Sequence, residues 1–179
     1  HGLVEFSRAR NLVVPDAIRR SMDTIADGIA KTAIIMLTNP NIINGLAWCN
    51  GASGITGALA ITGYLSHYPD LGDPYLTATQ AEIDEPASDD DQVGIDVSLC
   101  HGLAGTLSTL QLLRDFGYVD PKVVDKFHAY VEHIAFTAPI CFGYPNNIHD
   151  MGYLNGLGGT YHALYPENHG SIRPLFAGN

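Results

Sequence analysis

The chain has 179 residues, 46% of them hydrophobic, which is enough for a single domain with a hydrophobic core. Its 19 acidic and 9 basic residues give a formal net charge of −10, which argues against nucleic acid as a partner, because phosphate contacts depend on Lys and Arg. The longest apolar runs, such as residues 33–37, fall short of the roughly 20 residues that a membrane-spanning helix needs, so we expect no membrane span.

The pattern of apolar residues predicts helices along the chain. Proline suits the first turn of a helix, where its missing N–H would have no partner, so Pro15, Pro74 and Pro121 mark three helix starts. Three further helix-like segments follow glycine-rich turns, at residues 55–65, 106–116 and 160–165. In the helix after Pro15, one face is expected to carry Ile18, Met22, Ile25 and Ile29.

Alternating valine-rich strands are nearly absent, so the sequence predicts an all-α fold of helical hairpins. Such hairpins either stack into an open solenoid or curve into a closed α/α toroid, and the pattern alone favours neither.

A glycine motif recurs about every fifty residues along the chain. It consists of a polar residue, Gly, two small or apolar residues and a second Gly, and it lies at residues 50–54, 101–105 and 155–159. His1 and Gly2 are in register with these copies and are interpreted as a truncated fourth copy. The sequence therefore predicts a repeat architecture.

Two cysteines occupy the same position in this repeat. Cys49 and Cys100 each lie two residues before the first glycine of their copy, and His101 follows directly. Because equivalent positions of neighbouring helical repeats face the same end, we expect the two thiols to lie close together. Two thiolates and an imidazole are good zinc ligands, and three protein ligands leave the fourth tetrahedral position open to water or substrate.

The alternative is that both cysteines are buried and pack as small hydrophobic residues, which is also our interpretation of Cys141. Three cysteines are an odd number, and they are spaced far apart. This usage favours a reducing cytoplasm over a disulfide-stabilised fold.

The residues around the two cysteines resemble motifs of the lanthipeptide cyclase (LanC-like) family. Residues 48–54, Trp-Cys-Asn-Gly-Ala-Ser-Gly, resemble its Trp-Cys-x-Gly-x-x-Gly motif, and residues 100–105, Cys-His-Gly-Leu-Ala-Gly, its Cys-His-Gly-x-x-Gly motif. The resemblance spans about residues 1–165. It implies an α/α toroid with one zinc bound by Cys49, Cys100 and His101. Residues 1–179 would form one domain, the C-terminal portion of a ring about twice as long.

The resemblance also implies a reaction. Family members add a cysteine thiol of a dehydrated precursor peptide to a dehydroalanine or dehydrobutyrine of the same peptide, and a dehydratase is expected as a partner or a fused domain. His1-Gly2 looks like the start of the family's Ala-His-Gly motif, which makes His1 the candidate catalytic acid. Asn50 departs from the tyrosine often found at its position, and this affects the expected substrate contacts more than metal binding.

Two other functions are compatible with parts of the sequence. A LanC-like zinc protein that binds glutathione or a cysteine-containing partner would use the same ligands without forming rings. An α/α-toroid glycosidase would need two facing carboxylates, whereas the glycine motifs present Cys, His and Asn, so we rank this function last.

Overall fold

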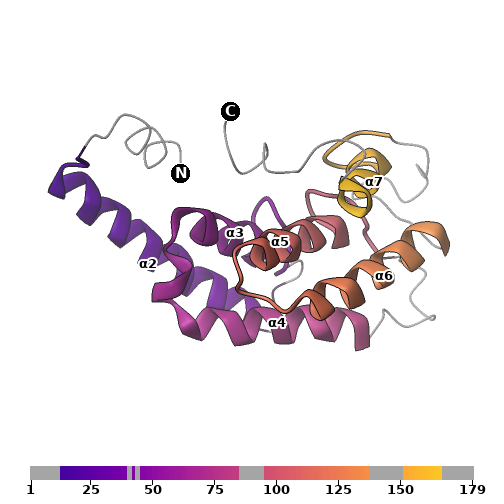
Figure 1. Cartoon of the computed structure of the whole chain (residues 1–179), viewed down its shortest axis with the longest axis horizontal. Helices are drawn as coiled ribbons and strands as arrows, with labels where there is room; N and C mark the ends of the chain where they lie inside the picture. The colour runs from indigo at the N-terminus through magenta and orange to yellow at the C-terminus, as the bar shows by residue number, and fades with distance from the viewer. Residues whose placement is uncertain (1–12, 40–41, 43–44, 85–94, 138–150, 167–179) are drawn as a thin grey trace.

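The regular elements of the chain are helical wherever the structure, a computed structural model, describes it (Figure 1). The described residues are 13–39, 42, 45–84, 95–137 and 151–166. The helices are α2 (Asp16–Thr38), α3 (Ala52–Thr62), the short 3-10 helix η1 (Leu65–His67), α4 (Pro69–Asp84), α5 (Leu103–Asp115), α6 (Pro121–Thr137) and α7 (Leu157–Leu164). The predicted all-α class is confirmed.

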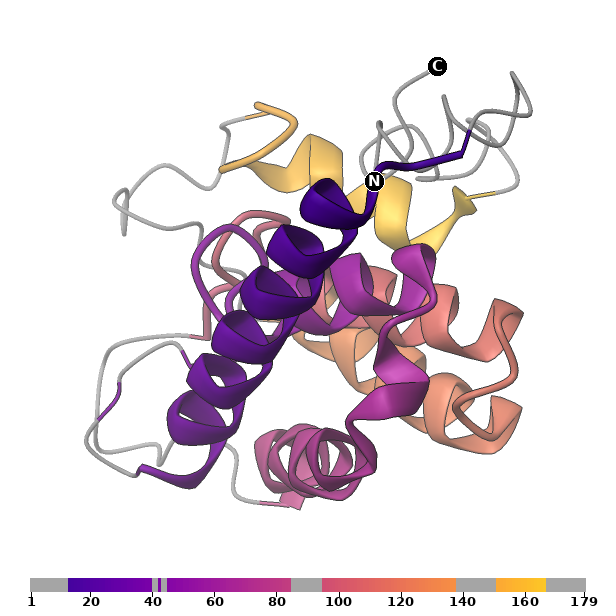
Figure 2. The same ribbon diagram turned by 90° about the vertical axis from the view of Figure 1, so that its left-hand side faces the viewer.

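The helices form two layers, and the chain alternates between them. In one layer α5 packs between α3 and α7, and in the other α4 packs against α2 and α6. The two layers are joined where α2 contacts α3 and where α6 contacts α5 (Figures 1 and 2). Each repeat therefore contributes one helix to each layer, as a helical-hairpin array requires. Closure of the layers into a toroid stays a prediction.

The helices α3, α5 and α7 begin earlier than predicted. Each starts directly after the first glycine of its motif, at Ala52, Leu103 and Leu157. The second glycine of each motif consequently lies in the first helical turn rather than in the preceding loop. The motif is thus a helix N-terminus that begins with glycine, which is tolerated at the N-cap position.

Prolines predicted two helix starts correctly. Helix α2 begins at Asp16, directly after Pro15, and α6 begins at Pro121. The predicted start at Pro74 is wrong, because α4 already begins at Pro69 and Pro74 lies inside the helix. Both prolines fit a first turn, and the earlier one takes that place.

Helix α2 is turned relative to its predicted apolar face. Its buried side chains are Ala26, Ala30 and Ala33, whereas Ile25 is 62% exposed and Ile18 is 38% exposed. A row of alanines lets α2 lie close to α3 and α4, since a small side chain keeps the helix axes near each other. Ile29, also on the predicted face, is half-buried and packs against the core, so the predicted and observed faces overlap in part.

The core fills the space between the two layers. Its largest fully buried side chains include Leu59, Leu71, Tyr75, Leu107, Leu110 and Phe127. A small polar cluster lies within this core, where Ser53 Oγ is 3.0 Å from the Tyr75 hydroxyl and 3.3 Å from Thr106 Oγ1. These contacts connect α3, α4 and α5 and satisfy the buried hydroxyls that take part in them.

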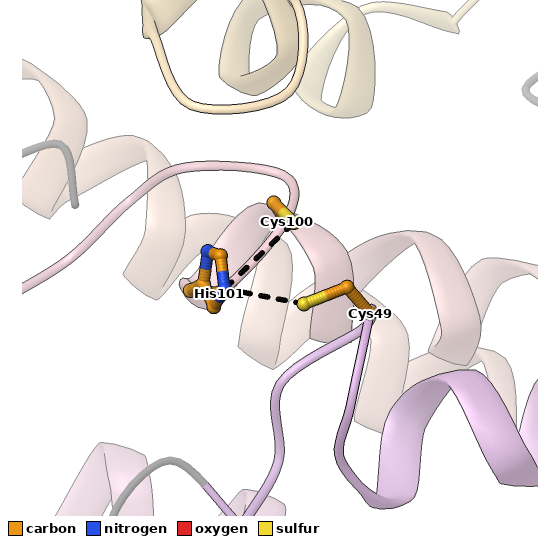
Figure 3. A group of neighbouring side chains, drawn as sticks. All are labelled: Cys49, Cys100 and His101. Atoms are coloured by element: carbon orange, nitrogen blue, oxygen red, sulfur yellow. Dashed lines mark hydrogen bonds between the residues drawn. The ribbon is translucent and has the colours of Figure 1, made fainter.

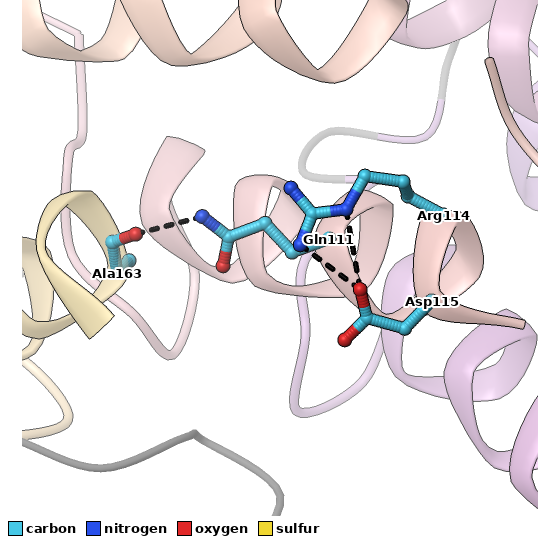
Figure 4. A network of polar contacts seen from close by, with 4 residues as sticks. All are labelled: Gln111, Arg114, Asp115 and Ala163. Carbon is cyan, nitrogen blue, oxygen red and sulfur yellow. Dashed lines mark hydrogen bonds and ion pairs between the residues drawn. The ribbon is translucent and has the colours of Figure 1, made fainter. Parts of the chain in front are cut away.

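Helix α7 is held at its C-terminal end by side chains from α5 and α6. Gln111 donates a hydrogen bond of 2.9 Å to the Ala163 carbonyl (Figure 4), and His128 Nε2 lies 2.9 Å from the Leu164 carbonyl. These carbonyls belong to the last turn, whose acceptors have no partner within the helix. The neighbouring Arg114–Asp115 ion pair is about 40% exposed at both side chains (39% and 38%) and adds little to stability.

No described helix has the length and hydrophobicity needed to cross a membrane.

Candidate metal centre

Three equivalent loops lie side by side at the start of α3, α5 and α7. The backbone N–H of Cys49 donates to the Cys100 carbonyl at 3.1 Å, and the N–H of Cys100 donates to the Leu154 carbonyl at 2.8 Å. Cys49, Cys100 and Leu154 each lie two residues before the first glycine of a motif. The same backbone hydrogen bond therefore joins the first loop to the second and the second to the third.

Glycine is required at the second motif position because the preceding loop folds back against it and, at Gly105 and Gly159, because the neighbouring loop is close as well. A Cβ placed on Gly105 would lie 2.8 Å from the Trp48 Cβ, and one on Gly159 would lie 2.8 Å from the Leu99 Cβ. Real Cβ atoms essentially never come so close. Trp48 and Leu99 each directly precede the cysteine of their loop. Gly105 therefore sets how closely the first and second loops approach, and Gly159 how closely the second and third do.

Cys49, Cys100 and His101 converge at this end of the helices (Figure 3). The imidazole Nε2 lies 3.2 Å from Cys49 Sγ and 3.9 Å from Cys100 Sγ, and all three atoms lie within 4.8 Å of one another. Tetrahedral bonds of about 2.3 Å to sulfur and about 2.0 Å to nitrogen would place a sulfur and a nitrogen ligand roughly 3.6 Å apart. The two observed separations lie on either side of that value, so the size of the cluster is compatible with a zinc ion.

The two thiols differ in environment. Cys49 is exposed, with its sulfur 3.5 Å from Asn50 Oδ1, whereas Cys100 is only 9% exposed. Burial, followed by the nearby Cys49 thiol and the charge of Asp96, raises the pKa of Cys100 to about 11. A thiol in such a place stays protonated at neutral pH unless a cation offsets the cost of a second negative charge.

The donor set indicates which metals the cluster can hold. Two thiolates and an imidazole suit zinc and other thiophilic metals, whereas magnesium and calcium require oxygen ligands. No further Cys, His, Asp or Glu joins the group among the residues that the structure describes. Three ligands are the number found in catalytic zinc sites, which keep one position open.

Sequence reasoning missed two residues next to this cluster. Asp96 Oδ1 accepts a hydrogen bond of 2.7 Å from the Ser98 N–H, and Ser98 Oγ accepts one of 3.4 Å from the His101 N–H. Neither residue belongs to the glycine motif. A comparison of the residues four and two positions before Cys100 with their counterparts in the first repeat would have singled them out.

Two other predicted residues lie outside the described part of the chain. These are His1, the predicted catalytic acid, and Cys141, which was predicted to be buried. Their roles stay predictions.

A sequence model of the lanthionine synthetase C-like protein family matches residues 19–172 of this chain. The match contains Cys49, Cys100, His101 and the three glycine motifs. Comparison with curated proteins found no match, and comparison with solved structures found none either.

Proposed function

The chain belongs to the lanthionine synthetase C-like family, and we propose on that basis that it carries the metal-binding half of a zinc-dependent lanthionine cyclase. The substrate would be a precursor peptide in which serine or threonine has been dehydrated. A cysteine S–H of that peptide would add across the C=C bond of a dehydroalanine or dehydrobutyrine. A new S–Cβ bond forms, Cα gains a proton, and the mass of the peptide does not change.

The observation that carries this proposal is the convergence of Cys49, Cys100 and His101 from two loops. The two cysteines lie 51 residues apart in the sequence. A zinc ion bound there would favour the thiolate form of a substrate cysteine at neutral pH, which is the nucleophilic form. Cys49 is exposed, so the cluster is accessible to a peptide.

Protein side chains have two further roles, which are to hold the metal ion and to donate a proton. Cys49, Cys100 and His101 hold the ion, and their two negative charges balance its two positive charges, which leaves a bound substrate sulfur more nucleophilic. Addition of sulfur to the C=C bond leaves a carbanion at Cα, stabilised as an enolate, that needs a proton. We propose His1 as its donor, because imidazole titrates near neutral pH.

We also propose that residues 1–179 are one domain, the C-terminal portion of an α/α toroid, and that a dehydratase acts before it as a partner or as a fused domain. A LanC-like protein that binds glutathione or a cysteine-containing partner would need the same three ligands. The two functions are separated by the fate of a dehydrated peptide, which only the cyclase converts.

The test uses the full-length protein and a dehydrated peptide that contains one cysteine. Cyclisation consumes the thiol, so mass spectrometry after alkylation separates ring from linear peptide. We expect Cys49→Ala to lose zinc and activity together, because one of three ligands is gone. Cys141→Ala is the matched control, since it removes the third cysteine of the chain, which belongs to none of the glycine motifs.

Two results would overturn parts of the proposal. Full activity of a zinc-free Cys49→Ala protein would end the zinc-dependent mechanism. His1→Asn should keep its zinc and slow turnover by on the order of 10² to 10⁴, and full activity of that variant would remove only the assignment of the acid.

A further inference from the structure

We propose that Asp96 and Ser98 form a positioning pair that shapes the loop so that two consecutive residues, Cys100 and His101, face the same metal ion. The inference rests on the proposed metal site and adds residues that do not touch the metal themselves. Neither residue is a catalytic group, and both act through the backbone of the loop.

The pair closes the loop on itself through four hydrogen bonds. The Asp96 carboxylate accepts from the Ser98 N–H at 2.7 Å, and the Asp96 carbonyl accepts from the Leu103 N–H at 2.9 Å. The Ser98 carbonyl accepts from the Gly102 N–H at 3.1 Å, and its hydroxyl accepts from the His101 N–H at 3.4 Å. The loop that carries both side chains is thus fixed at its start and at its end.

Consecutive ligands make a special demand on the backbone. In an extended chain neighbouring side chains point to opposite faces, so Cys100 and His101 would diverge. Here Cys100 Sγ and His101 Nε2 lie 3.9 Å apart, which requires a turn at these two residues. The bond from the Ser98 N–H to the Asp96 carboxylate sets an Asx turn just before these two residues, and the Ser98 hydroxyl then accepts from the His101 N–H.

The first repeat provides an internal comparison. Its loop supplies a single predicted ligand, Cys49, and its residues in register with Asp96 and Ser98 are Gly45 and Ala47. The Gly45 carbonyl still accepts the Ala52 N–H at 2.7 Å, as the Asp96 carbonyl accepts the Leu103 N–H. The backbone contact is therefore common to both loops, and the two polar side chains occur together where two ligands are presented.

The third repeat agrees with this difference. Its loop has Leu154 at the cysteine position, and Gly152 takes the place of the serine. Asp150, in register with Asp96, lies outside the described residues. An aspartate and a serine together thus occur only in the second repeat, which is the one with two ligands.

The second carboxylate oxygen supports a functional reason for Asp96. Oδ2 is buried and has no hydrogen-bond partner. Burying a carboxylate oxygen without a partner costs stability, so the residue is not explained by stability alone. Its charge lies beside a site for a cation, where a negative charge is favourable.

The experiment measures Co²⁺ affinity and the absorption spectrum of the bound Co²⁺ in the full-length protein. Asp96→Ala removes the acceptor, and we expect Co²⁺ to bind about 10 to 100 times more weakly, with an altered spectrum. Asp96→Asn keeps an oxygen for the Ser98 N–H and loses only the charge, so its affinity should fall by no more than about fivefold from that of the unchanged protein. Affinity of Asp96→Ala within about threefold of the unchanged protein, or equal losses in both variants, would overturn the pairing.

Asp120→Ala is the matched control. Asp120 Oδ1 accepts the Lys122 N–H at 2.9 Å, the same two-residue bond, at the start of α6. This variant should leave Co²⁺ affinity and spectrum unchanged, and a loss like that of Asp96→Ala would also overturn the proposal. If Asp96→Ala does not fold, Ser98→Ala decides instead. It should weaken binding about 3 to 10 times, and unchanged binding would refute the pair.

A second measurement needs no metal and separates this inference from the proposed function. In metal-free protein, oxidative cross-linking of Cys49 to Cys100 reports whether the two sulfurs meet, because a disulfide tolerates little misplacement. Asp96→Ala should slow the cross-linking at least about threefold relative to Asp120→Ala. Equal rates refute the pair, whereas failure of the unchanged protein to bind Co²⁺ refutes the metal site.

Discussion

Gly105→Ala is the substitution that most directly tests how the loops are spaced. An added Cβ would lie 2.8 Å from the Trp48 Cβ and closer still to the Leu99 carbonyl oxygen. Alanine favours a helix over glycine by about 1 kcal/mol, but forcing an atom into a packed site costs about 1 to 3 kcal/mol, and more where the obstacle is backbone. The Leu99 carbonyl cannot move away alone, because Cys100 follows directly and both its backbone groups are hydrogen-bonded.

We therefore expect Gly105→Ala to destabilise the protein by about 2 kcal/mol, which for a chain of this size lowers Tm by about 4 to 8 °C. Calorimetry of the metal-free protein measures this. Gly28→Ala, on α2, is the control, since a Cβ there meets no atom within 4 Å, and it should stabilise by up to about 1 kcal/mol. A Gly105→Ala protein as stable as the Gly28→Ala protein would show that the loops are not packed as described.

Two further predictions follow from individual buried groups. Because the pKa of Cys100 is raised to about 11, its alkylation in metal-free folded protein should keep accelerating up to about pH 11, whereas in urea it should level off above about pH 9. The raised pKa of Cys100 stabilises the fold below about pH 8.5, and that contribution is lost as the pH rises towards 11. If the alkylation rate of the folded protein levels off near pH 9, both statements are contradicted. Thr56 is 1% exposed and its hydroxyl has no partner, so Thr56→Val should raise the free energy of unfolding by about 1 kcal/mol in urea titrations, and a loss of stability would refute this.

The sequence was sufficient for the fold class and for the grouping of the three candidate ligands. Both depend on the repeat, and the register of Cys49 with Cys100 can be counted directly from the glycines. Equivalent positions in a repeat array have equivalent surroundings, so a count along the chain becomes a position in space. The structure brings Cys49, Cys100 and His101 together as that count predicts.

Local patterns were less reliable where two signals compete. Pro69 and Pro74 both suit a helix start, and α4 begins at the earlier of the two. In α2 the large isoleucines suggested the buried face, but close contact between helices selects the small side chains of Ala26, Ala30 and Ala33. Hydrophobicity along a helix identifies an apolar side, and it does not reveal how near the neighbouring helix lies.

The residues that sequence reasoning missed act through the backbone. Asp96 and Ser98 bond to N–H groups within their own loop, and such bonds depend on a loop conformation that no periodicity reports. Aspartate and serine are also common in loops for many reasons. Their meaning emerges only when the second repeat is compared with the first.

The backbone hydrogen bonds that join Cys49 to Cys100 and Cys100 to Leu154 have a consequence for how such a site can change over evolution. The N–H of Cys49 bonds to the Cys100 carbonyl, and the N–H of Cys100 bonds to the Leu154 carbonyl. The accepting residue thus carries a thiol in one case and an isobutyl group in the other. The cysteine position of a loop can therefore gain or lose a metal ligand by a single substitution without altering this backbone contact. At that position the ligand is a property of the individual side chain, while the place that it would occupy is inherited from the repeat.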